Sequence, residues 1–448
     1  MFANTYAEKI MQIAQPTMQR QSNVCKASYV KSKPFVAALH CIVTATAIAA
    51  CAGCSAQEAA IALPAPRDTI TLQSGYFSSD YGNNVDYAQF VLEQSRGTER
   101  LARWVYESNM ERFDRPALRT ALFLGANMVN FLGNSSLAYH EWGHASRMEA
   151  GGQKAQFFTS MDALNPAPSR SFLGYAGNML FKFSGATGSV DATSAFKANK
   201  ESGRAHDAIV NGAGVNNEIY LAERNDEQYF LQGHGGIFGI FNSENRFAIA
   251  RYVTWVSDSP GNDMNNITRV YRQSGVDRNI QADDLRNINL LSAFSGAVVS
   301  DVLARRDFIA DGKTEAQPWL IKGFLVPNQY NYLSSRGITR KWMSAYAFHD
   351  RLKLLGSYES VVRGDEYSEL GLGIYKDFGA WDVYGKVTGK DFDTLNLEAA
   401  ASTYVAKDWK LGITAYVWDS RSLLGERNTL DFSKNKTQQV SVALSYVY

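Results

Sequence analysis

Cysteine is absent from this 448-residue chain after residue 54. Its four cysteines, Cys25, Cys41, Cys51 and Cys54, all lie within the first 54 residues. The rest of the chain therefore has no disulfide and no thiolate metal site, so any metal site there must use histidine and carboxylate ligands. Histidine is scarce too, with six in the chain. If two histidines occur at the spacing that metal binding requires, a histidine-rich composition therefore does not explain them.

The chain also lacks an excess of basic residues. Residues 1–54 hold five of the 45 Lys and Arg and one of the 44 Asp and Glu, which leaves 40 basic against 43 acidic residues, or about −3. Nucleic-acid-binding domains present basic patches. The charge balance therefore argues against nucleic acid as a partner.

A convincing membrane-spanning helix is missing near the centre of the chain. Residues 120–139 carry no charge, but they include Asn127, Asn130, Asn134 and two glycines. Such a composition makes a poor spanning helix. We expect this stretch to be a buried helix.

Residues 1–54 have the pattern of a bacterial secretory leader. Lys31 and Lys33 precede an apolar stretch, residues 35–50, that ends in small residues. The sequence before Cys54 resembles a lipoprotein processing site, which predicts a lipid anchor on that cysteine. Ordinary cleavage before Gln57 is the alternative. Both interpretations predict export to the periplasm or outer membrane.

The motif His140-Glu141-Trp142-Gly143-His144 is the most informative segment of the chain. On a helix, positions i and i+4 share one face, so both imidazoles can bind one zinc ion. The pattern HExxH is typical of zinc peptidases, in which the glutamate is the general base for a metal-bound water. Glu141 is thus the predicted catalytic base, and His140 and His144 are the predicted zinc ligands.

The flanks of the motif favour a helix. Residues 134–136, Asn-Ser-Ser, suit a helix N-cap, and Gly151 and Gly152 are typical of a helix end. Gly143, inside the motif, has no side chain, so another backbone can pack closely there.

A catalytic zinc site needs a third protein ligand. The motif followed downstream by Asn217-Glu218 resembles the gluzincins, zinc metallopeptidases whose third ligand is a glutamate. This resemblance implies Glu218 as that ligand. His234, among glycines, is a candidate donor to the oxyanion of a tetrahedral intermediate. The competing donors nearby are His206, Asp207, Glu223 and His234 itself.

The motif and residues 213–217 are also similar to the membrane-embedded site-2 proteases. Those enzymes take their third ligand from an Asp-Gly that follows an Asn-x-x-Pro segment. Here Asn165-Pro-Ala-Pro168 has no Asp-Gly after it, and Asp311-Gly312 lacks the preceding pattern. The chain departs from that family at its third ligand.

The apolar pattern after the leader predicts an α+β protein. Residues 55–83 are expected to be a linker with one possible strand at 69–73. Residues 84–328 are expected to be a mainly helical metallopeptidase-like domain. In residues 329–448 apolar and polar residues alternate over segments of about 9–12 residues, as in antiparallel membrane strands. The expected helices are 87–110, 116–139 with the motif helix after it, 205–228, 246–256 and 283–305.

The last strand carries a further resemblance. Val440, Val442, Leu444, Tyr446 and the terminal Tyr448 form an apolar row. This row resembles the C-terminal strand of bacterial outer-membrane β-barrels, which ends in an aromatic residue. It implies a barrel in outer-membrane lipid. Six or seven expected strands after residue 340, with one more at 69–73 or around Tyr330, allow a barrel of about eight strands. A soluble antiparallel sheet is the alternative.

Together these patterns predict a zinc metallopeptidase of the bacterial cell envelope that acts on a peptide or protein substrate. A non-catalytic outer-membrane barrel or adhesin with a structural metal site is the alternative function.

Overall fold

The computed structural model describes residues 69–77, 84–133, 136–153, 155–159, 188–192, 200–232, 244–256, 262–314, 318–349, 351–391 and 394–447. The predicted leader and His234 lie outside these residues. The chain from Ala59 to Tyr448 forms one compact unit, and the predicted boundary between residues 328 and 329 falls inside one of its strands.

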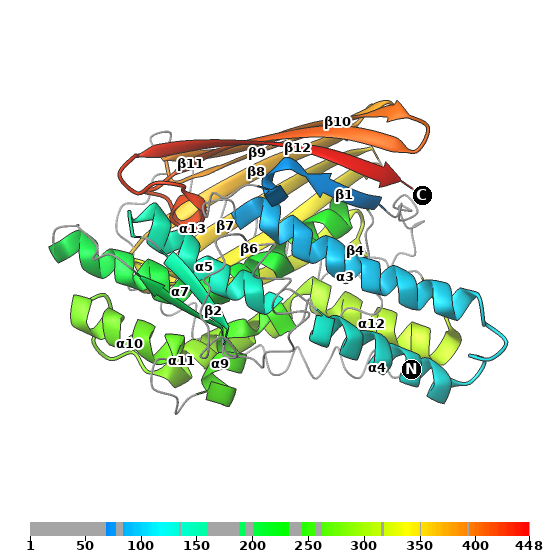
Figure 1. Cartoon of the computed structure of the whole chain (residues 1–448), viewed down its shortest axis with the longest axis horizontal. Helices are drawn as coiled ribbons and strands as arrows, with labels where there is room; N and C mark the ends of the chain where they lie inside the picture. The colour runs from blue at the N-terminus through cyan, green and yellow to red at the C-terminus, as the bar shows by residue number, and fades with distance from the viewer. Residues whose placement is uncertain are drawn as a thin grey trace. The chain divides into compact units, whose positions relative to one another are not determined.

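One antiparallel sheet of ten strands organises the structure (Figure 1). Nearly all of its strands are joined in sequence order, and the early strand at 69–73 pairs with the last one. In spatial order the strands are β1 (Thr69–Gln73), β12 (Lys436–Val447), β11 (Trp409–Asp419), β10 (Leu395–Ala406), β9 (Trp381–Gly389), β8 (Ser368–Asp377), β7 (Leu352–Gly364), β6 (Gly337–His349), β5 (Phe324–Ser334) and β4 (Leu320–Ile321).

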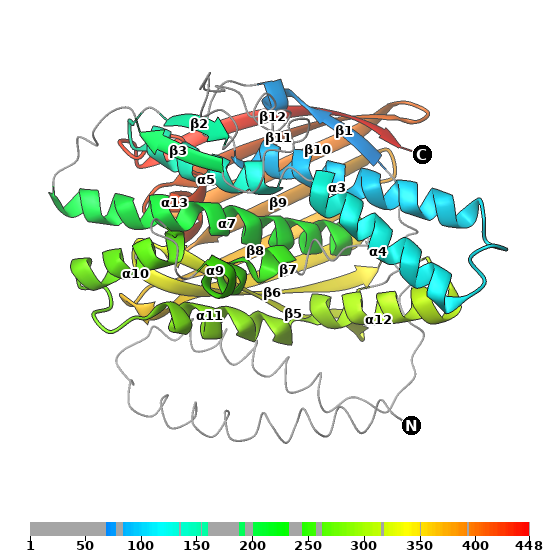
Figure 2. The same ribbon diagram turned by 60° about the horizontal axis from the view of Figure 1, so that its bottom comes forward.

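The sheet confirms the predicted α+β class and the predicted strand at 69–73, but a closed barrel of about eight strands is wrong. Among the described residues β1 and β4 end the sheet and do not pair with each other. Helices lie along one face of the sheet instead (Figure 2). Helices already cover the polar face of this sheet, so that face is buried without closure into a barrel.

The helices that cover this face agree in part with the predicted ones. The motif helix and the helix around residues 205–228 are confirmed, whereas a helix at residues 263–274 was not foreseen. A short hairpin of β2 (Ala155–Thr159) and β3 (Gly188–Ala192) lies beside them. The helices are α3 (Asn84–Glu107), α4 (Pro116–Gly133), α5 (Ser136–Ala150), α7 (Lys200–Gln232), α9 (Ala248–Val256), α10 (Asp263–Ser274), α11 (Ala282–Leu290), α12 (Gly296–Asp311) and α13 (Leu423–Asn428), with 3-10 turns η1 (Ser74–Phe77) and η3 (Leu291–Phe294).

Among the described helices, no single one has the length and apolarity needed to cross a membrane. The segment Ala282–Phe294 and α12, which meet at a bend of 62°, pass that criterion only as a pair.

Helix α7 is held against the sheet by buried ion pairs. Side chains alternate between the two faces of a strand, and in this sheet the polar ones point toward the helices. Buried charges need partners, and here α7 and α13 supply them. The pairs are Lys341 with Glu223, Lys386 with Glu227 (3.2 Å), Glu398 with Arg224 (3.0 Å) and Glu359 with Arg427 (2.6 and 2.7 Å).

Breaking the Glu359–Arg427 pair is expected to be costly. Arg427→Met leaves the Glu359 carboxylate, 3 % exposed, without its bidentate partner. We expect the free energy of unfolding to fall by about 3–5 kcal/mol in chemical denaturation. Lys434→Met, which breaks an exposed pair with Asp431, is the control and should cost about 1 kcal/mol or less. Equal losses in the two variants would contradict this account.

Candidate metal centre

Helix α5 carries the HExxH motif and is buried along most of its length. The side chains of Tyr139 and Trp142 lie in the main hydrophobic core. His140 and His144 are also buried, on the face that meets α7 and α10, and Glu141 between them is half-buried. Packing of the apolar residues therefore fixes the direction in which both imidazoles point.

Two glycines let α5 and α7 approach closely. A Cβ atom at Gly143 would lie 2.6 Å from the carbonyl oxygen of Ala213, so a larger residue would push the helices apart. A Cβ atom at Gly214 would lie 2.5 Å from His144 Nε2 and press equally on His140 Nε2. Gly214 thus keeps open the space between the two imidazoles.

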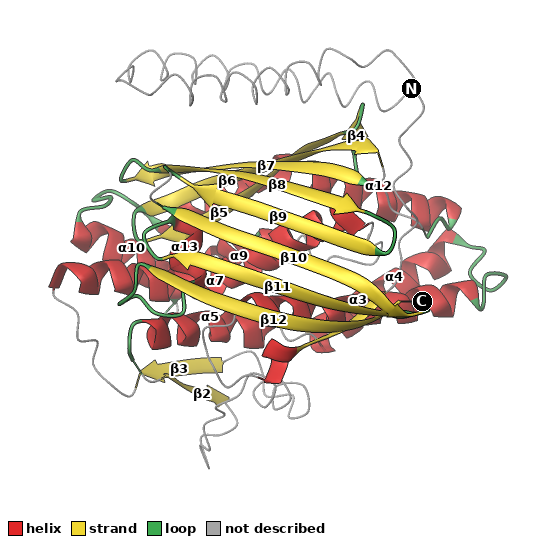
Figure 3. Cartoon of the chain, turned by 90° about the horizontal axis from the view of Figure 1, so that it is seen from above, coloured by secondary structure: helices red, strands yellow, loops and turns green. Residues whose placement is uncertain are grey.

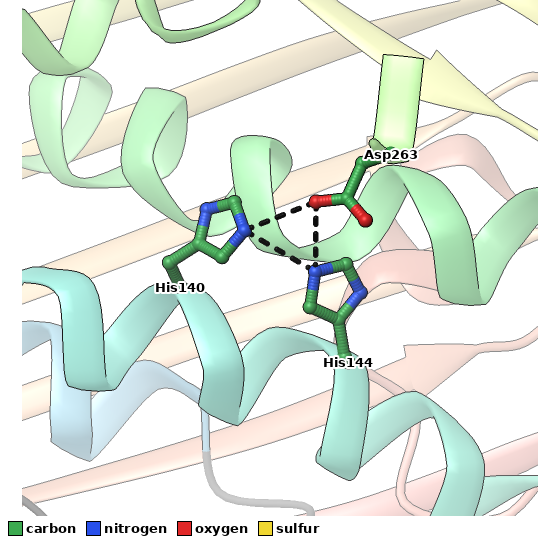
Figure 4. Close-up of side chains that lie close together, drawn as sticks. All are labelled: His140, His144 and Asp263. Carbon is green, nitrogen blue, oxygen red and sulfur yellow. Dashed lines mark hydrogen bonds and ion pairs between the residues drawn. The ribbon is translucent and has the colours of Figure 1, made fainter. Parts of the chain in front are cut away.

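Three ligand atoms converge on that space. His140 Nε2 and His144 Nε2 are 3.2 Å apart, and each lies 3.2 Å from Asp263 Oδ2 (Figure 4). Two ligands of a tetrahedral zinc ion at ~2.0–2.1 Å are about 3.3 Å from each other. His140, His144 and Asp263 could therefore hold a metal ion.

The other nitrogen of each imidazole faces a hydrogen-bond acceptor. His140 Nδ1 lies 2.7 Å from Glu218 Oε1, and His144 Nδ1 lies 2.7 Å from the carbonyl oxygen of Val210. Both acceptors belong to α7. Metal-binding histidines usually donate this second N–H to a carboxylate or carbonyl, which leaves Nε2 free to bind the metal.

Asp263 is the site residue that sequence reasoning missed. It is the first residue of α10, and the side chain of Asn262 caps this helix by accepting from Met264 N at 2.7 Å. A carboxylate in the first turn of a helix is stabilised by the helix dipole. The Asn-Asp pair after Pro260-Gly261 is a helix-start signal that could have revealed it.

Glu218, the ligand implied by the gluzincin resemblance, lies on the far side of His140. Its second oxygen forms an ion pair with Arg251 of α9. The carboxylate thus faces Nδ1 of His140 and Arg251, whereas Asp263 faces the Nε2 atoms. The geometry suits Glu218 as an orienting partner of His140 better than as a metal ligand.

Three of the competing donors lie elsewhere. Glu223 pairs with Lys341 and accepts from Tyr332 at 2.6 Å, against the sheet. His206 Nε2 lies 3.0 Å from the carbonyl oxygen of Arg147, and Asp207 is exposed.

The site has a surplus of negative charge. Burial lowers the pKa of His140, but hydrogen bonds to Asp263 and Glu218 outweigh it and raise the pKa to about 10. Burial raises the pKa of Glu141, against the opposing effect of the two histidines. The acidic neighbours favour a cation at these nitrogen atoms, and a metal ion that binds there has to displace the proton.

Tyr252 of α9 was also missed. Its ring stacks on the imidazole of His140 with centroids 4.7 Å apart, and its hydroxyl lies 3.1 Å from His140 Nδ1 and 3.2 Å from Nε2. Burial and nearby carboxylates raise the pKa of Tyr252 well above its usual value. The hydroxyl is therefore protonated at neutral pH and can donate a hydrogen bond.

No protein-family model matches this chain, and a search of curated proteins finds no relative.

Replacing Gly214 by alanine should abolish metal binding. The added Cβ would occupy the space between the two Nε2 atoms. We expect wild-type protein to bind one zinc per chain and Gly214→Ala to bind none, measured by elemental analysis after dialysis. Gly97→Ala is the matched control, because Gly97 also lies inside a helix and a Cβ there meets nothing within 4 Å. Full zinc occupancy in Gly214→Ala would show that the metal does not lie between these nitrogens.

Proposed function

We propose that this protein is a zinc-dependent hydrolase of peptide bonds. The observation that carries the proposal is the convergence of His140 Nε2, His144 Nε2 and Asp263 Oδ2 at 3.2 Å from one another, beside a half-buried glutamate. Two imidazoles and one carboxylate suit zinc, and three protein ligands are typical of catalytic rather than structural zinc sites.

Zinc bound at this site would supply a Lewis acid that polarises a carbonyl and lowers the pKa of a bound water. Glu141 takes the proton from the attacking water and returns it to the leaving amine. Tyr252 donates a hydrogen bond to the oxygen that becomes negatively charged.

Two residues of α7 and α9 act through His140. Glu218 accepts the N–H of His140 and fixes the ring, and Arg251 holds the Glu218 carboxylate in place. The Arg251–Glu218 pair lowers the pKa of Glu218 despite its burial, so Glu218 stays ionised.

Glu141→Gln tests the assignment of the general base. The amide keeps the size of the side chain but cannot take a proton, so we expect zinc content to be unchanged and the hydrolysis rate to fall by about 10²–10⁴-fold. The assay follows cleavage of a mixed peptide library by mass spectrometry. Asp207→Asn, an exposed carboxylate on α7, is the control and should keep full activity.

Two outcomes would count against the proposal. Loss of zinc together with activity in Glu141→Gln would place Glu141 among the ligands. A wild-type protein that binds zinc and cleaves no peptide would point to a structural metal site in a non-catalytic envelope protein.

We also propose that the protein is exported to the bacterial cell envelope, on the basis of residues 31–54. Mass spectrometry of the mature N-terminus is expected to find a lipid-modified Cys54. An unmodified N-terminus at Gln57 would refute the lipid anchor and keep export, whereas a mature chain that retains residues 1–54 would refute export.

A further inference from the structure

The sheet turns its apolar side chains away from the helices. Figure 3 views this outward face, and the helices lie behind the strands. On β7 through β12 the buried positions are mainly polar or small, and the alternate positions, which are exposed, are mainly apolar. An ordinary soluble sheet has the opposite arrangement. Six of the exposed apolar residues are Leu354, Leu372, Val387, Leu397, Ile413 and Val442.

The register makes this surface continuous. Leu372 pairs with Val387, and Val387 pairs with Leu397 on the next strand. The face starts at β6, because the outward side chain of Asn331 on β5 donates to Ser292 of η3. Large contiguous apolar surfaces of this kind mark sites of contact with another protein or with a membrane.

Charge is nearly absent from this face. On the outward positions from β6 to β1, the described residues include three cations, Arg340, Lys376 and Lys436, and one carboxylate, Asp419, which lies opposite Lys436 at the ends of β11 and β12. The carboxylates of the sheet, such as Glu359 and Glu398, point to the helices. Hydrocarbon tolerates a face with so few charges.

The two ends of the apolar band differ. At one end the outward or turn positions carry aromatic residues, which include Phe348, Trp381 and Trp409. At the other end Arg340, Ser360 and Ser368 form a polar row across three strands in register. Aromatic residues concentrate where a bilayer meets water.

The height of the band fits a bilayer. On β11 the outward residues run from Trp409 to Val417, which is a stretch of nine residues. A strand that crosses a bilayer at a tilt of ~45° needs about 9–11 residues.

Some backbone groups along the edges of the sheet have side-chain partners. Along β5, Asn216 of α7 bonds Leu333 N at 2.8 Å and Leu333 O at 2.6 Å, and Ser295 accepts from Gln329 N at 2.9 Å. At the opposite edge, Ser74 accepts from Val442 N at 3.0 Å, just beyond the end of β1. A backbone group without a partner in hydrocarbon costs several kcal/mol, so these bonds lower the cost of contact with lipid at these positions.

We propose that the outward face of β6–β12 and β1 rests against the hydrocarbon of a lipid bilayer, with the aromatic end at the interface. The helices and the metal centre lie on the opposite side of the sheet. This inference goes beyond the proposed hydrolysis and does not depend on the metal site, so it can fail while the hydrolysis holds.

Fluorescence quenching by lipid tests this contact directly. The full chain with its four cysteines changed to serine has no other thiol, and it also lacks the predicted lipid anchor. Leu372→Cys and Ile413→Cys, at positions 66 % and 51 % exposed, remove no core contact and accept an environment-sensitive fluorophore. Met110→Cys, exposed in the connection between α3 and α4, is the control.

In phosphatidylcholine vesicles brominated on their acyl chains, the probes at 372 and 413 should emit at shorter wavelength and lose most of their fluorescence. The probe at 110 should do neither. Long-wavelength emission without quenching at 372 and 413 would show a face in water. Short-wavelength emission without quenching, together with a dimeric mass, would show a second copy on this face. Either result would overturn the proposal.

Discussion

The close crossing of α5 and α7 is the constraint on which the candidate site depends. Gly143 lets the backbone of α7 approach α5, and Gly214 leaves a gap where the two imidazoles meet. With the helices this close, α7 also supplies the acceptors for both Nδ1 atoms, Glu218 and the carbonyl of Val210. This one contact between two helices thus sets the distance between the two imidazoles, the orientation of their rings and the space for a metal ion.

Helix α7 in turn depends on the sheet. Its carboxylates at 223 and 227 pair with Lys341 and Lys386 from the strands, and its C-terminal carbonyls accept from Lys353. The face of the sheet that carries these buried charges could not pack against an apolar core, so a charged helix has to lie against that face. The apolar side chains are left on the opposite face, which therefore needs a different partner.

The sequence predicted local patterns well and tertiary arrangement less well. Short-range periodicity predicted the motif helix, the strand at 69–73 and the strands after residue 340. The structure contains all of these elements. Asp263 lies 119 residues after His144. The apolar spacing of Met264, Ile267 and Tyr271 indicates a helix there, but nothing in that spacing links its first residue to the motif, so only the folded chain brings Asp263 to the site. Alternation predicted two unlike faces of the sheet, but it could not show that helices would cover the polar one and leave the sheet open.

Glu218 shows the same limit within the site. Its position after the motif placed it correctly beside His140, but sequence spacing does not distinguish a ligand from a residue that orients a ligand. That distinction depends on which ring nitrogen it faces, and here it faces Nδ1.

X-ray absorption at the zinc edge tests the metal centre most directly. Wild-type protein loaded with zinc should show two imidazoles and oxygen donors at ~2.0–2.2 Å. Asp263→Ala should lose an oxygen donor and bind zinc weakly, whereas Glu218→Ala should keep two imidazoles and lose about 10–100-fold in zinc affinity. A spectrum without imidazole, or a carboxylate lost from the coordination shell in Glu218→Ala and kept in Asp263→Ala, would contradict this account.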